Sequence, residues 1–504
     1  MSGQAHSVAL VGVDGRIVDV EAAVGGGLPR TVLVGLPDAS LYEARDRCRA
    51  AVVGSKLAWP DHLLTINLSP ATLPKSGSHY DLAIIAAVWR SEGHVPPRLR
   101  ERTVMLGEVG LGGRVRPVLG LLPALIAAAE AGFSAAIVPA DQLREAALVK
   151  GVKLYGVGSL EEFQQVLRGA AGAQVPAGEK GATVATGRVP DFAEVIGQPE
   201  ARWAMEVAAA GRHHISLSGP PGVGKTMLAS RLPSILPPLS DREALEVSAV
   251  HSLAGMPVEG LVHTPPFADP HHGASAVAMI GGGSRVIRPG AISLAHRGVL
   301  FLDEAPEFSP KVLESLRTPL ESGEVLIARS GMRARFPARF QLVLASNPCP
   351  CGNWGSTTQH CRCQPYTVRR YQERVSGPIL DRIDIHQNLR QQHRSVSRLV
   401  ELGECSASIA DRVREARARQ ARRLRDTPWS TNAEVSGAGL RQLPLPAGME
   451  MLDRALRRNQ LTARGIDKVW RLAWSVADLS GRDRVSADHL ATALAMRQEK
   501  GEAA

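Results

Sequence analysis

The first 168 residues alternate between short apolar runs and stretches with helical spacing. Strand-like runs occur at 8–11, 16–20, 31–34, 63–68, 104–106 and 135–138, and helical patterns occur between them at 41–53, 81–89 and 121–131. The first two runs flank Asp14-Gly15, a pair that favours a type I′ hairpin turn because both central residues need positive φ. The pattern predicts a mixed α/β domain over residues 1–168.

Residues 169–188 are rich in Ala and Gly, which predicts a linker. Apolar strands return at 189–390 and predict a second α/β domain. From about residue 395 the spacing is helical, with helices expected at 411–426, 450–459, 466–478 and 487–498 in a C-terminal helical domain, 395–504. The expected fold class is therefore α/β and multidomain.

The helix expected at 411–426 is unusually basic, with seven arginines and three acids. Such charge runs are typical of a solvated helix face, and contact with DNA is the alternative.

Composition narrows the classes further. Hydrophobic residues make up 44% of the 504 and charged residues 21%, which excludes wholesale disorder. The most membrane-like stretch, 118–140, contains Pro123, Glu130, Gly132 and Pro139, so a helix and a buried strand are predicted there instead. The absence of a signal-like N-terminus and the six cysteines favour a cytoplasmic protein. The net charge of +10 is compatible with a polyanionic partner.

A phosphate-binding loop is the most specific motif. Residues 219–226 match G-x-x-x-x-G-K-[ST], with an apolar strand at 215–218 before them and a helical pattern at 227–232 after them. Backbone N–H groups of such a loop surround phosphates, Lys225 would reach the β- and γ-phosphates, and Thr226 would bind Mg²⁺. The expected nucleotide-binding residues are Gly219, Pro220, Pro221, Gly222, Val223, Gly224, Lys225 and Thr226.

A second nucleotide motif is the apolar run 298–302, which ends in Asp303 and Glu304. Asp303 can bind Mg²⁺, and Glu304 can orient or deprotonate the attacking water. An apolar strand ending in two acids is weak evidence alone, but together with the phosphate loop it predicts an ATPase.

This order of motifs resembles that of AAA+ ATPases. Three segments are similar to the magnesium-chelatase-related branch, and most of all to the ComM/YifB family: PHHGAS at 270–275, GGG at 281–283 and PGAISLAH at 289–296. The resemblance implies a P-loop core with a parallel sheet and a helical lid, ATP and Mg²⁺ as cofactors, and a ring, expected to be a hexamer. It also implies translocation on single-stranded or branched DNA, as a helicase or branch-migration motor in recombination or DNA uptake.

The resemblance assigns three further residues. Asn347 follows a sensor-1-like strand and would polarise the attacking water. Arg382 lies in LDRID, 380–384, and would act as an arginine finger on the neighbouring subunit's ATP, or else form a salt bridge with Asp381 or Asp384. Arg464 lies in LTARG, 461–465, which resembles a sensor-2 helix start and implies contact with the same subunit's nucleotide.

Four cysteines follow the sensor-1-like strand: Cys349, Cys351, Cys361 and Cys363. Four thiolates within so short a segment suit tetrahedral Zn²⁺, although one-residue spacing within each pair is tighter than usual. His360 is a substitute ligand, and reduced structural thiols are the alternative reading.

The N-terminal domain resembles the proteolytic domain of Lon, in PKSG at 74–77, LGEV at 106–109 and GRVRPV at 113–118. Aligned on these motifs, the catalytic serine position holds His79 and the lysine position holds Leu122. Lys75 is on the same segment as Ser76 and Ser78 and is not expected to face them. The domain is therefore predicted to lack the Ser–Lys dyad and to serve assembly or substrate binding.

Basic and histidine residues between the two nucleotide motifs are the DNA candidates: His271, His272, Arg285 and Arg288. A metal-binding pair or a packed loop is the alternative for the two histidines. A second basic set is expected on a hairpin and comprises Arg329, Arg333, Arg335 and Arg339. Two rival functions remain, a chelatase motor subunit and an ATP-driven protein-remodelling chaperone.

Overall fold

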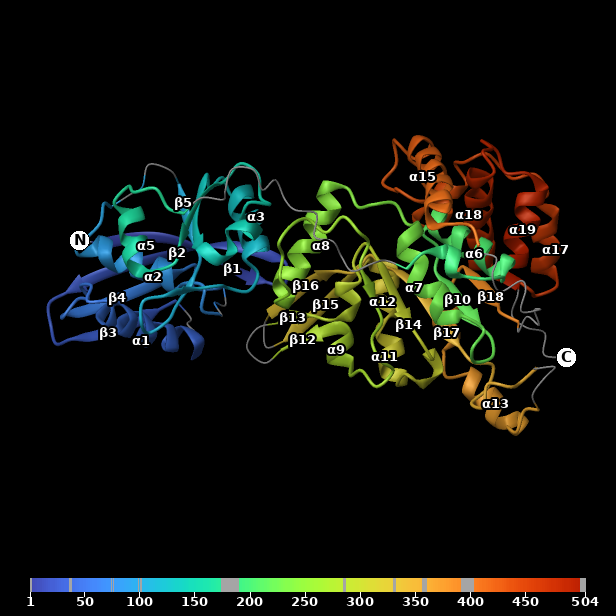
Figure 1. Ribbon diagram of the computed structural model, residues 1–504, viewed down its shortest axis with the longest axis horizontal. Coiled ribbons are helices and arrows are strands. Elements are labelled where there is room, and N and C mark those ends of the chain that lie inside the picture. The colour runs from blue at the N-terminus through green and yellow to red at the C-terminus, as the bar shows by residue number, and fades with distance from the viewer. Residues whose placement is uncertain are drawn as a thin grey trace.

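The computed structural model describes residues 2–35, 39–73, 75, 77–97, 99, 102–173, 190–283, 287–329, 332–355, 360–390 and 403–498. Arg285, Ser76 and most of the expected linker lie outside these ranges. The N-terminal unit lies at one end of an elongated molecule, a parallel-sheet core in the middle, and the C-terminal helices at the other end (Figure 1).

The main sheet of the N-terminal unit has the order β1-β2-β4-β3. Its strands are β1 (Ser2–Val11), β2 (Asp14–Gly25), β3 (Arg30–Val34) and β4 (Leu63–Ser69). The pairs β1–β2 and β2–β4 are antiparallel, whereas β3 runs parallel to β4. The alternating burial of β4 places Leu64, Ile66 and Leu68 in the core, as its alternating sequence predicts.

The first hairpin turns two residues earlier than expected. Val11 pairs with Asp14, so Gly12 and Val13 make the reversal and Asp14-Gly15 already belongs to β2. Gly12 has φ +68° and supplies the left-handed conformation that a tight turn needs. The prediction of a turn at Asp14-Gly15 was therefore wrong, and the Asp14 side chain is free to contact the core.

A smaller parallel sheet, β5-β8-β9, completes this unit. Its strands are β5 (Thr103–Met105), β8 (Ala135–Pro139) and β9 (Lys153–Val157), beside a short hairpin of β6 (Glu108–Val109) and β7 (Val115–Arg116). The helices of the unit are α1 (Ala39–Gly54), α2 (Asp81–Ser91), α3 (Leu121–Glu130), η1 (Ala140–Gln142), α4 (Leu143–Ala146) and α5 (Leu160–Leu167).

The central core contains a five-stranded sheet in the order β11-β14-β17-β10-β18, with every pair parallel. Its strands are β10 (Ile215–Ser218), β11 (Phe267–Ala268), β14 (Val299–Leu302), β17 (Gln341–Ser346) and β18 (Ile385–Asn388). β14 and β17 are almost wholly buried, which is typical of strands covered by helices on both faces. All carboxyl ends of these strands meet at one edge of the sheet.

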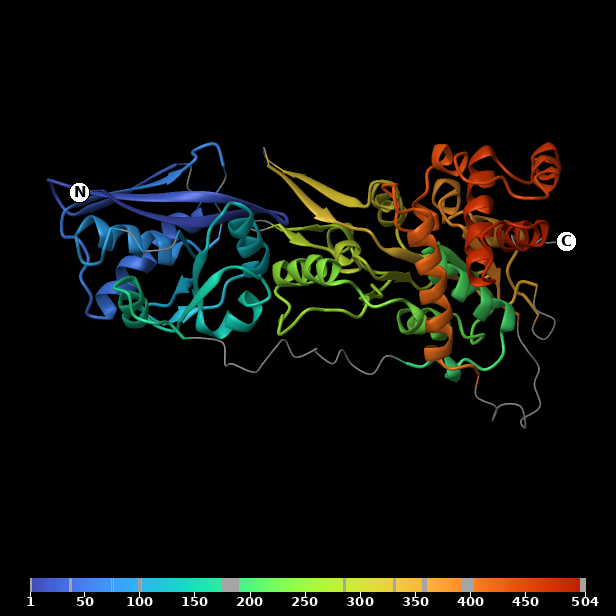
Figure 2. The ribbon, with the colours of Figure 1, turned by 90° about the horizontal axis from the view of Figure 1, so that it is seen from above.

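Helices and two short ribbons surround this sheet (Figure 2). The first ribbon pairs β12 (Gly281–Gly282) with β13 (Arg288–Pro289), and the second pairs β15 (Glu324–Arg329) with β16 (Met332–Pro337). The helical segments are η2 (Phe192–Glu194), α6 (Pro199–Gly211), α7 (Lys225–Ile235), α8 (Asp241–Ala254), α9 (Ala276–Ile280), α10 (Ala291–Leu294), η3 (Ala305–Glu307), α11 (Pro310–Ser315), α12 (Arg317–Ser322), α13 (Pro365–Gln372) and α14 (Gly377–Leu380).

The C-terminal part is helical, as predicted. It comprises α15 (Ser406–Arg423), η5 (Asn432–Glu434), α16 (Gly437–Leu440), α17 (Glu450–Arg457), α18 (Ala463–Leu479) and α19 (Ala487–Gln498). One hydrophobic cluster contains Trp470 and Trp474 of α18, Ala208 of α6 and Ile215 of β10. The C-terminal helices therefore share a core with the parallel sheet.

The basic face of α15 is only partly solvated. Arg412 binds Glu206 and Glu404, Arg417 donates to the Ala209 carbonyl, and Arg423 forms a two-pronged pair with the buried Asp478. The expectation of a solvated face was wrong for these residues, because carboxylates and carbonyls of neighbouring helices accept their N–H groups.

The N-terminal unit contacts the core at two places. The backbones of Gly12 and Arg335 form a parallel bridge, and the Arg335 guanidinium donates to Asp14 at 3.1 Å. At the second place, α3 packs on α8, and the Ser252 hydroxyl of α8 donates to Glu145 of α4 at 2.5 Å. Burial raises the pKa of Glu145, while hydrogen bonds from Ser252 and Gln142 act against that rise.

The predicted α/β architecture with a parallel P-loop core and helical C-terminal part is confirmed. The membrane-like stretch 118–140 forms α3 and β8, as expected. None of the described helices combines the length and apolar character that crossing a bilayer requires.

Candidate functional site

The phosphate loop connects β10 to α7, at the carboxyl edge of the sheet. Gly222 and Gly224 have φ of +79° and +97°, a conformation that L side chains rarely adopt. A Cβ at Gly219 would lie 2.5 Å from the Leu389 carbonyl oxygen, so this position also requires glycine. The loop ends at the first turn of α7, where free backbone N–H groups and the helix dipole favour an anion.

Direct hydrogen bonds join the phosphate loop and the start of α7 to the ends of β14 and β17. Lys225 Nζ donates to Asn347 Oδ1 at 2.9 Å, and also to the Gly219 and Pro220 carbonyls. Thr226 Oγ1 donates to Asp303 Oδ2 at 2.7 Å. Burial lowers the pKa of Lys225, and the charges of Asp303 and Glu304 act in the opposite direction. The structure thus brings together residues from β10–α7, β14 and β17.

Glu304 lies beside this group in an uncommon backbone conformation. Its φ is +51°, its N–H donates to Asp303 Oδ1 at 2.9 Å, and its carbonyl accepts from Glu307 N at 2.7 Å. Non-glycine residues in this region cost about 1–3 kcal/mol and are concentrated at functional sites. The side chain is half-exposed, and one carboxylate oxygen lies 3.5 Å from His272 Nδ1.

Arg382 does not project into solvent. Its guanidinium pairs with Glu321 and donates to the Pro378 carbonyl at 2.7 Å, and its side chain is 14% exposed. The expected alternative, a salt bridge to Asp381 or Asp384, is not formed among the described residues, since Glu321 of α12 is the partner.

Arg464 is paired with the segment that precedes β18. It lies 3.8 Å from Asp381, which precedes β18, and is 77% exposed. Ile385 pairs with Ile215 at the amino end of β10, whereas the phosphate loop follows its carboxyl end about 13 Å away, four residues along the strand. The expected contact of Arg464 with the same subunit's nucleotide stays a prediction.

Two residues that the sequence interpretation missed anchor the segment 381–384. Lys468 donates to Asp384 and to the Arg382 carbonyl, both at 2.7 Å, and Arg497 donates to the Ile383 carbonyl. The sequence contained a signal for this contact. Arg464 and Lys468 are four residues apart and therefore lie on one face of a helix, and the segment LDRID contains two acids that could pair with them.

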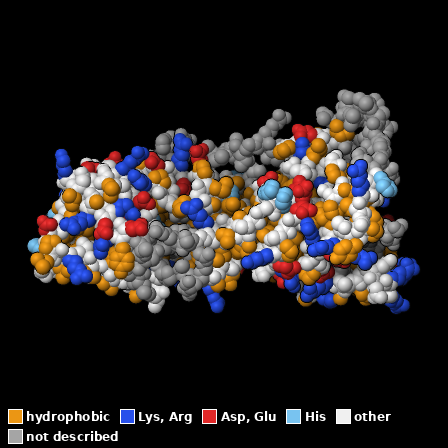
Figure 3. All heavy atoms as spheres, turned by 90° about the horizontal axis from the view of Figure 1, so that it is seen from below, with side chains coloured by type: hydrophobic (Ala, Val, Ile, Leu, Met, Phe, Trp, Pro, Cys, Tyr) orange, Lys and Arg blue, Asp and Glu red, His pale blue; other side chains and the backbone are white. Residues whose placement is uncertain are grey.

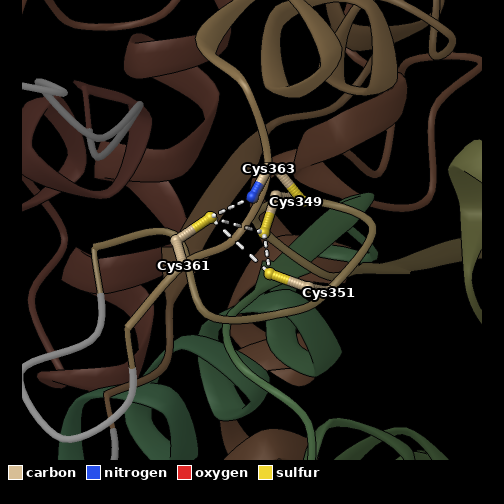
Figure 4. A group of neighbouring side chains, drawn as sticks. All are labelled: Cys349, Cys351, Cys361 and Cys363. Atoms are coloured by element: carbon tan, nitrogen blue, oxygen red, sulfur yellow. Dashed lines mark hydrogen bonds between the residues drawn. The ribbon is translucent and has the colours of Figure 1, made fainter.

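The four cysteines converge on one point (Figure 4). Cys349 Sγ lies 3.4 Å from Cys351 Sγ and 3.7 Å from Cys361 Sγ, and Cys351 Sγ lies 3.6 Å from Cys361 Sγ. A Zn–S distance of about 2.3 Å places tetrahedral ligands about 3.8 Å apart, so the donor set fits zinc. In the described part of the loop, the group of potential ligands comprises these thiols and not His360.

The cysteine loop packs directly on the phosphate loop. A Cβ at Gly352 would lie 2.4 Å from the Pro221 side chain, so the two loops approach as closely as a glycine allows. Cys349 also follows Asn347 by only two residues. The cysteine cluster is therefore in position to support both the phosphate loop and the end of β17.

The candidate DNA-contacting residues do not all lie together in the structure. His272 lies against Glu304, Arg285 is outside the described residues, and Arg288 is exposed on β13. Arg333 is exposed on the second ribbon, but Arg335 is bound by Asp14 and Glu324. Acidic and basic side chains are interspersed on the face shown in Figure 3, so the charge of +10 is not gathered there.

The N-terminal segment shows no protease-like pair within the described residues. Lys75 Nζ donates to the carbonyls of Gly35, Pro70 and Leu73, and Ser78 donates to Glu108. The buried His79 ring bonds to the Val8 carbonyl, and burial lowers its pKa to about 4. Lys75 is therefore engaged by backbone carbonyls and directs no lone pair at a hydroxyl.

Three family models match the chain. "Magnesium chelatase, subunit ChlI" matches residues 191–397, its C-terminal counterpart matches 403–497, and "Subunit ChlI of Mg-chelatase" matches 20–142. The first match includes both nucleotide motifs and the cysteine cluster.

Several relatives match over nearly their whole length. An uncharacterized protein of Mycobacterium tuberculosis is 50% identical, with 98% of both chains covered. Uncharacterized protein YifB of Escherichia coli and competence protein ComM of Haemophilus influenzae are 38% and 37% identical, each with 98% of this chain and 96% of the relative covered. The magnesium-chelatase 38 kDa subunit of Rhodobacter capsulatus is 27% identical over 31% of this chain.

Proposed function

Since this chain belongs to the ComM/YifB family of magnesium-chelatase-related AAA+ ATPases, we propose that it hydrolyses ATP to drive translocation on DNA, in helicase or branch-migration work during recombination or DNA uptake. Membership implies use of ATP and Mg²⁺ and assembly into an oligomer. The observation that carries the proposal is a pair of hydrogen bonds beside Glu304. One joins Lys225 to Asn347 and the other joins Thr226 to Asp303.

Thr226 and Asp303 fit a magnesium site because a hydroxyl and a carboxylate oxygen, 2.7 Å apart, are the ligands that Mg²⁺ prefers. Lys225 would bind the β- and γ-phosphates, and Asn347 would orient the attacking water. Bound Mg²⁺ would neutralise charge that develops on the transferred phosphoryl group. Glu304 would accept the proton of that water.

Arg382 and Arg464 support a ring. Both lie around the segment 381–384, which precedes β18 at the amino end of the sheet, whereas the phosphate loop follows the carboxyl end of β10, and this placement supports a role at a neighbouring site. We infer that both act on the neighbouring subunit's ATP, with Arg382 leaving Glu321 when subunits meet. Catalysis then depends on assembly, because the charge that stabilises the transition state comes from a second copy.

DNA as the substrate is supported by exposed arginines on both ribbons, Arg288 and Arg333, and by the charge of +10. Phosphate contacts of this kind do not read sequence, which suits a motor that moves along DNA. The name of the Haemophilus influenzae relative, competence protein ComM, agrees with a role in DNA uptake.

We also propose that the cysteine cluster holds one zinc ion as a structural site. Four thiolates complete a tetrahedron, so this metal would have no open position for chemistry. Its role would be to rigidify the loop that packs on Pro221.

The test is the ATPase rate without DNA and with single-stranded DNA, duplex and a four-way junction. We expect stimulation that is greatest on the junction, loss of turnover in Glu304→Gln with ATP binding retained, and loss of binding in Lys225→Ala. Hydrolysis that no DNA changes would contradict DNA translocation. It would then favour the rival protein-remodelling or chelatase-type motors.

A further inference from the structure

The helix α13 follows the cysteine cluster directly and has two unlike faces. Cys363 N donates to Cys361 Sγ at 3.4 Å, so the chain is tied to the cluster two residues before Pro365 begins the helix. Val368 and Tyr371 are buried on the inner face. The helix lies at the periphery of the core, and its outer face is open to solvent (Figure 1).

The inner face of α13 is anchored beside the nucleotide site. Gln372 Nε2 donates to the carbonyl of Pro348, which follows β17, at 3.0 Å. Arg374, just after the helix, pairs at 3.0 Å with Glu307 of η3, the turn that follows the proposed catalytic carboxylate. Burial raises the pKa of Tyr371 to about 12, and the negative charge of Glu307 raises it further. These contacts fix the direction in which the outer face points.

The outer face combines positive charge with an exposed aromatic ring. Tyr366 is 72% exposed, and Arg369 and Arg370 follow it by three and four residues, which places all three on one side of the helix. Arg362 is exposed just before the helix. In the segment 360–373 these three arginines outnumber the one acid, Glu373. In the described part of the chain, no carboxylate pairs with their guanidinium groups.

The chemistry of this face matches a single strand of nucleic acid. Guanidinium groups bind phosphate oxygens, and an exposed aromatic ring can stack on a base. The bases of a duplex are already stacked on one another, so the ring favours an unpaired strand. A partner with the opposite charge is required, because the unpaired arginines would repel a basic surface.

We propose that the outer face of α13 binds single-stranded DNA, with Arg362, Arg369 and Arg370 on phosphates and the Tyr366 ring against a base. The inference rests on the proposed function, in which DNA is the polymer that the motor moves along. It adds a contact that is separate in the chain from the arginines of the two ribbons. The cysteine cluster then has a second role, since it positions the start of this helix.

The experiment measures the Kd of the full chain for a fluorescent thymidine oligonucleotide by anisotropy, over a series of salt concentrations. In Arg369→Gln/Arg370→Gln we expect weaker binding and a salt slope that is smaller by about 0.7 per arginine removed. Tyr366→Ala weakens binding at least about fivefold at every salt concentration, because stacking is not ionic, whereas Tyr366→Phe retains the wild-type Kd. Arg457→Gln/Arg458→Gln removes two adjacent exposed charges elsewhere and is the matched control.

A double variant of α13 with the wild-type slope overturns the proposal, and so does Tyr366→Ala with the wild-type Kd. A loss of binding that accompanies a lower oligomeric mass by light scattering also overturns it, and assigns the face to contact between copies of the chain. An equal loss with duplex DNA overturns the preference for a single strand. A wild type that does not bind the oligonucleotide contradicts the proposed function as well, whereas a wild type that binds while the α13 variants match it overturns only this inference.

Discussion

The Thr226 hydroxyl, in the first turn of α7, donates a hydrogen bond to the Asp303 carboxylate at the end of β14. The Thr226 hydroxyl is the only part of that side chain that can bind Mg²⁺, and its methyl group has no comparable role. A substitution of Thr226 can therefore remove the metal ligand without changing the packing. A substitution of Lys225 cannot do this so cleanly, because Lys225 also donates to carbonyls of the phosphate loop.

Replacement of Thr226 by Val should reduce kcat/KM for MgATP at least about tenfold, because a ligand with charge-assisted bonding is lost. Excess Mg²⁺ should restore part of the rate. Thr226→Ser keeps the hydroxyl and is the matched control. Equal ATPase rates of the Val and Ser variants, measured over a Mg²⁺ titration, would contradict the assignment.

Glu246 provides a pH-dependent contribution to folding. A hydrogen bond from His296, and then the charge and hydrogen bonds of Arg297, hold its pKa at about 2, below the ordinary 4.5. His296 and Arg297 lie close before β14, so this group ties α8 to the strand that ends in Asp303.

Because the folded-state pKa is depressed, the Glu246 carboxylate stabilises the fold above about pH 4.5, and this stabilisation is lost as the pH falls towards 2. Glu246→Gln should cost about 1 kcal/mol at pH 7, since the group is partly exposed. The difference in urea midpoint from wild type should shrink below pH 4.5. A pH-independent difference would assign the effect to packing instead.

At the element scale, the cysteine loop and the phosphate loop meet at Gly352 and Pro221. Ordering of one loop should therefore support the other. The sequence revealed the four thiols, but the close approach of Gly352 to Pro221 depends on how β17 and β10 lie next to each other.

Cys351→Ser should remove the metal, which elemental analysis would find at about one zinc per chain in wild type. We expect a severalfold rise of KM for ATP, because Pro221 loses its support. Cys405→Ser alters an exposed thiol outside the cluster and is the control. Wild-type protein without zinc would contradict the zinc site. Unchanged ATP binding in metal-free Cys351→Ser would contradict the support of Pro221 by the cysteine loop.

The sequence predicts a contact well when local motifs position both residues, and poorly when the two residues are far apart in the chain. Strand ends in a parallel sheet meet at one edge, so the motifs at Lys225, Asp303 and Asn347 predict their own proximity. The position of Arg464 depends on how α18 packs on α6, through contacts such as His213–Ser475 that span 262 residues. The pairing of Arg412 with Glu206 is equally long-range and left no local signal.

At the scale of the whole molecule, the location of Arg464 leads to a prediction for mixed rings. Lys225→Ala subunits lack a working nucleotide site but retain Arg464, whereas Arg464→Ala subunits retain the nucleotide site. If Arg464 acts on the neighbouring subunit, mixing two inactive preparations should restore ATPase activity at mixed interfaces. If it acts within one subunit, the mixture should stay inactive, as should each preparation alone.

The bridge between Gly12 and Arg335 has a mechanical consequence. Arg335 is on β16, the returning strand of an exposed ribbon, and Val13 N also donates to its carbonyl at 3.2 Å. The ribbon cannot tilt alone, because the stiff β1–β2 hairpin is joined to its side (Figure 2). A change in the position of the ribbon therefore requires either that this bridge opens or that the β1–β2 hairpin moves together with the ribbon.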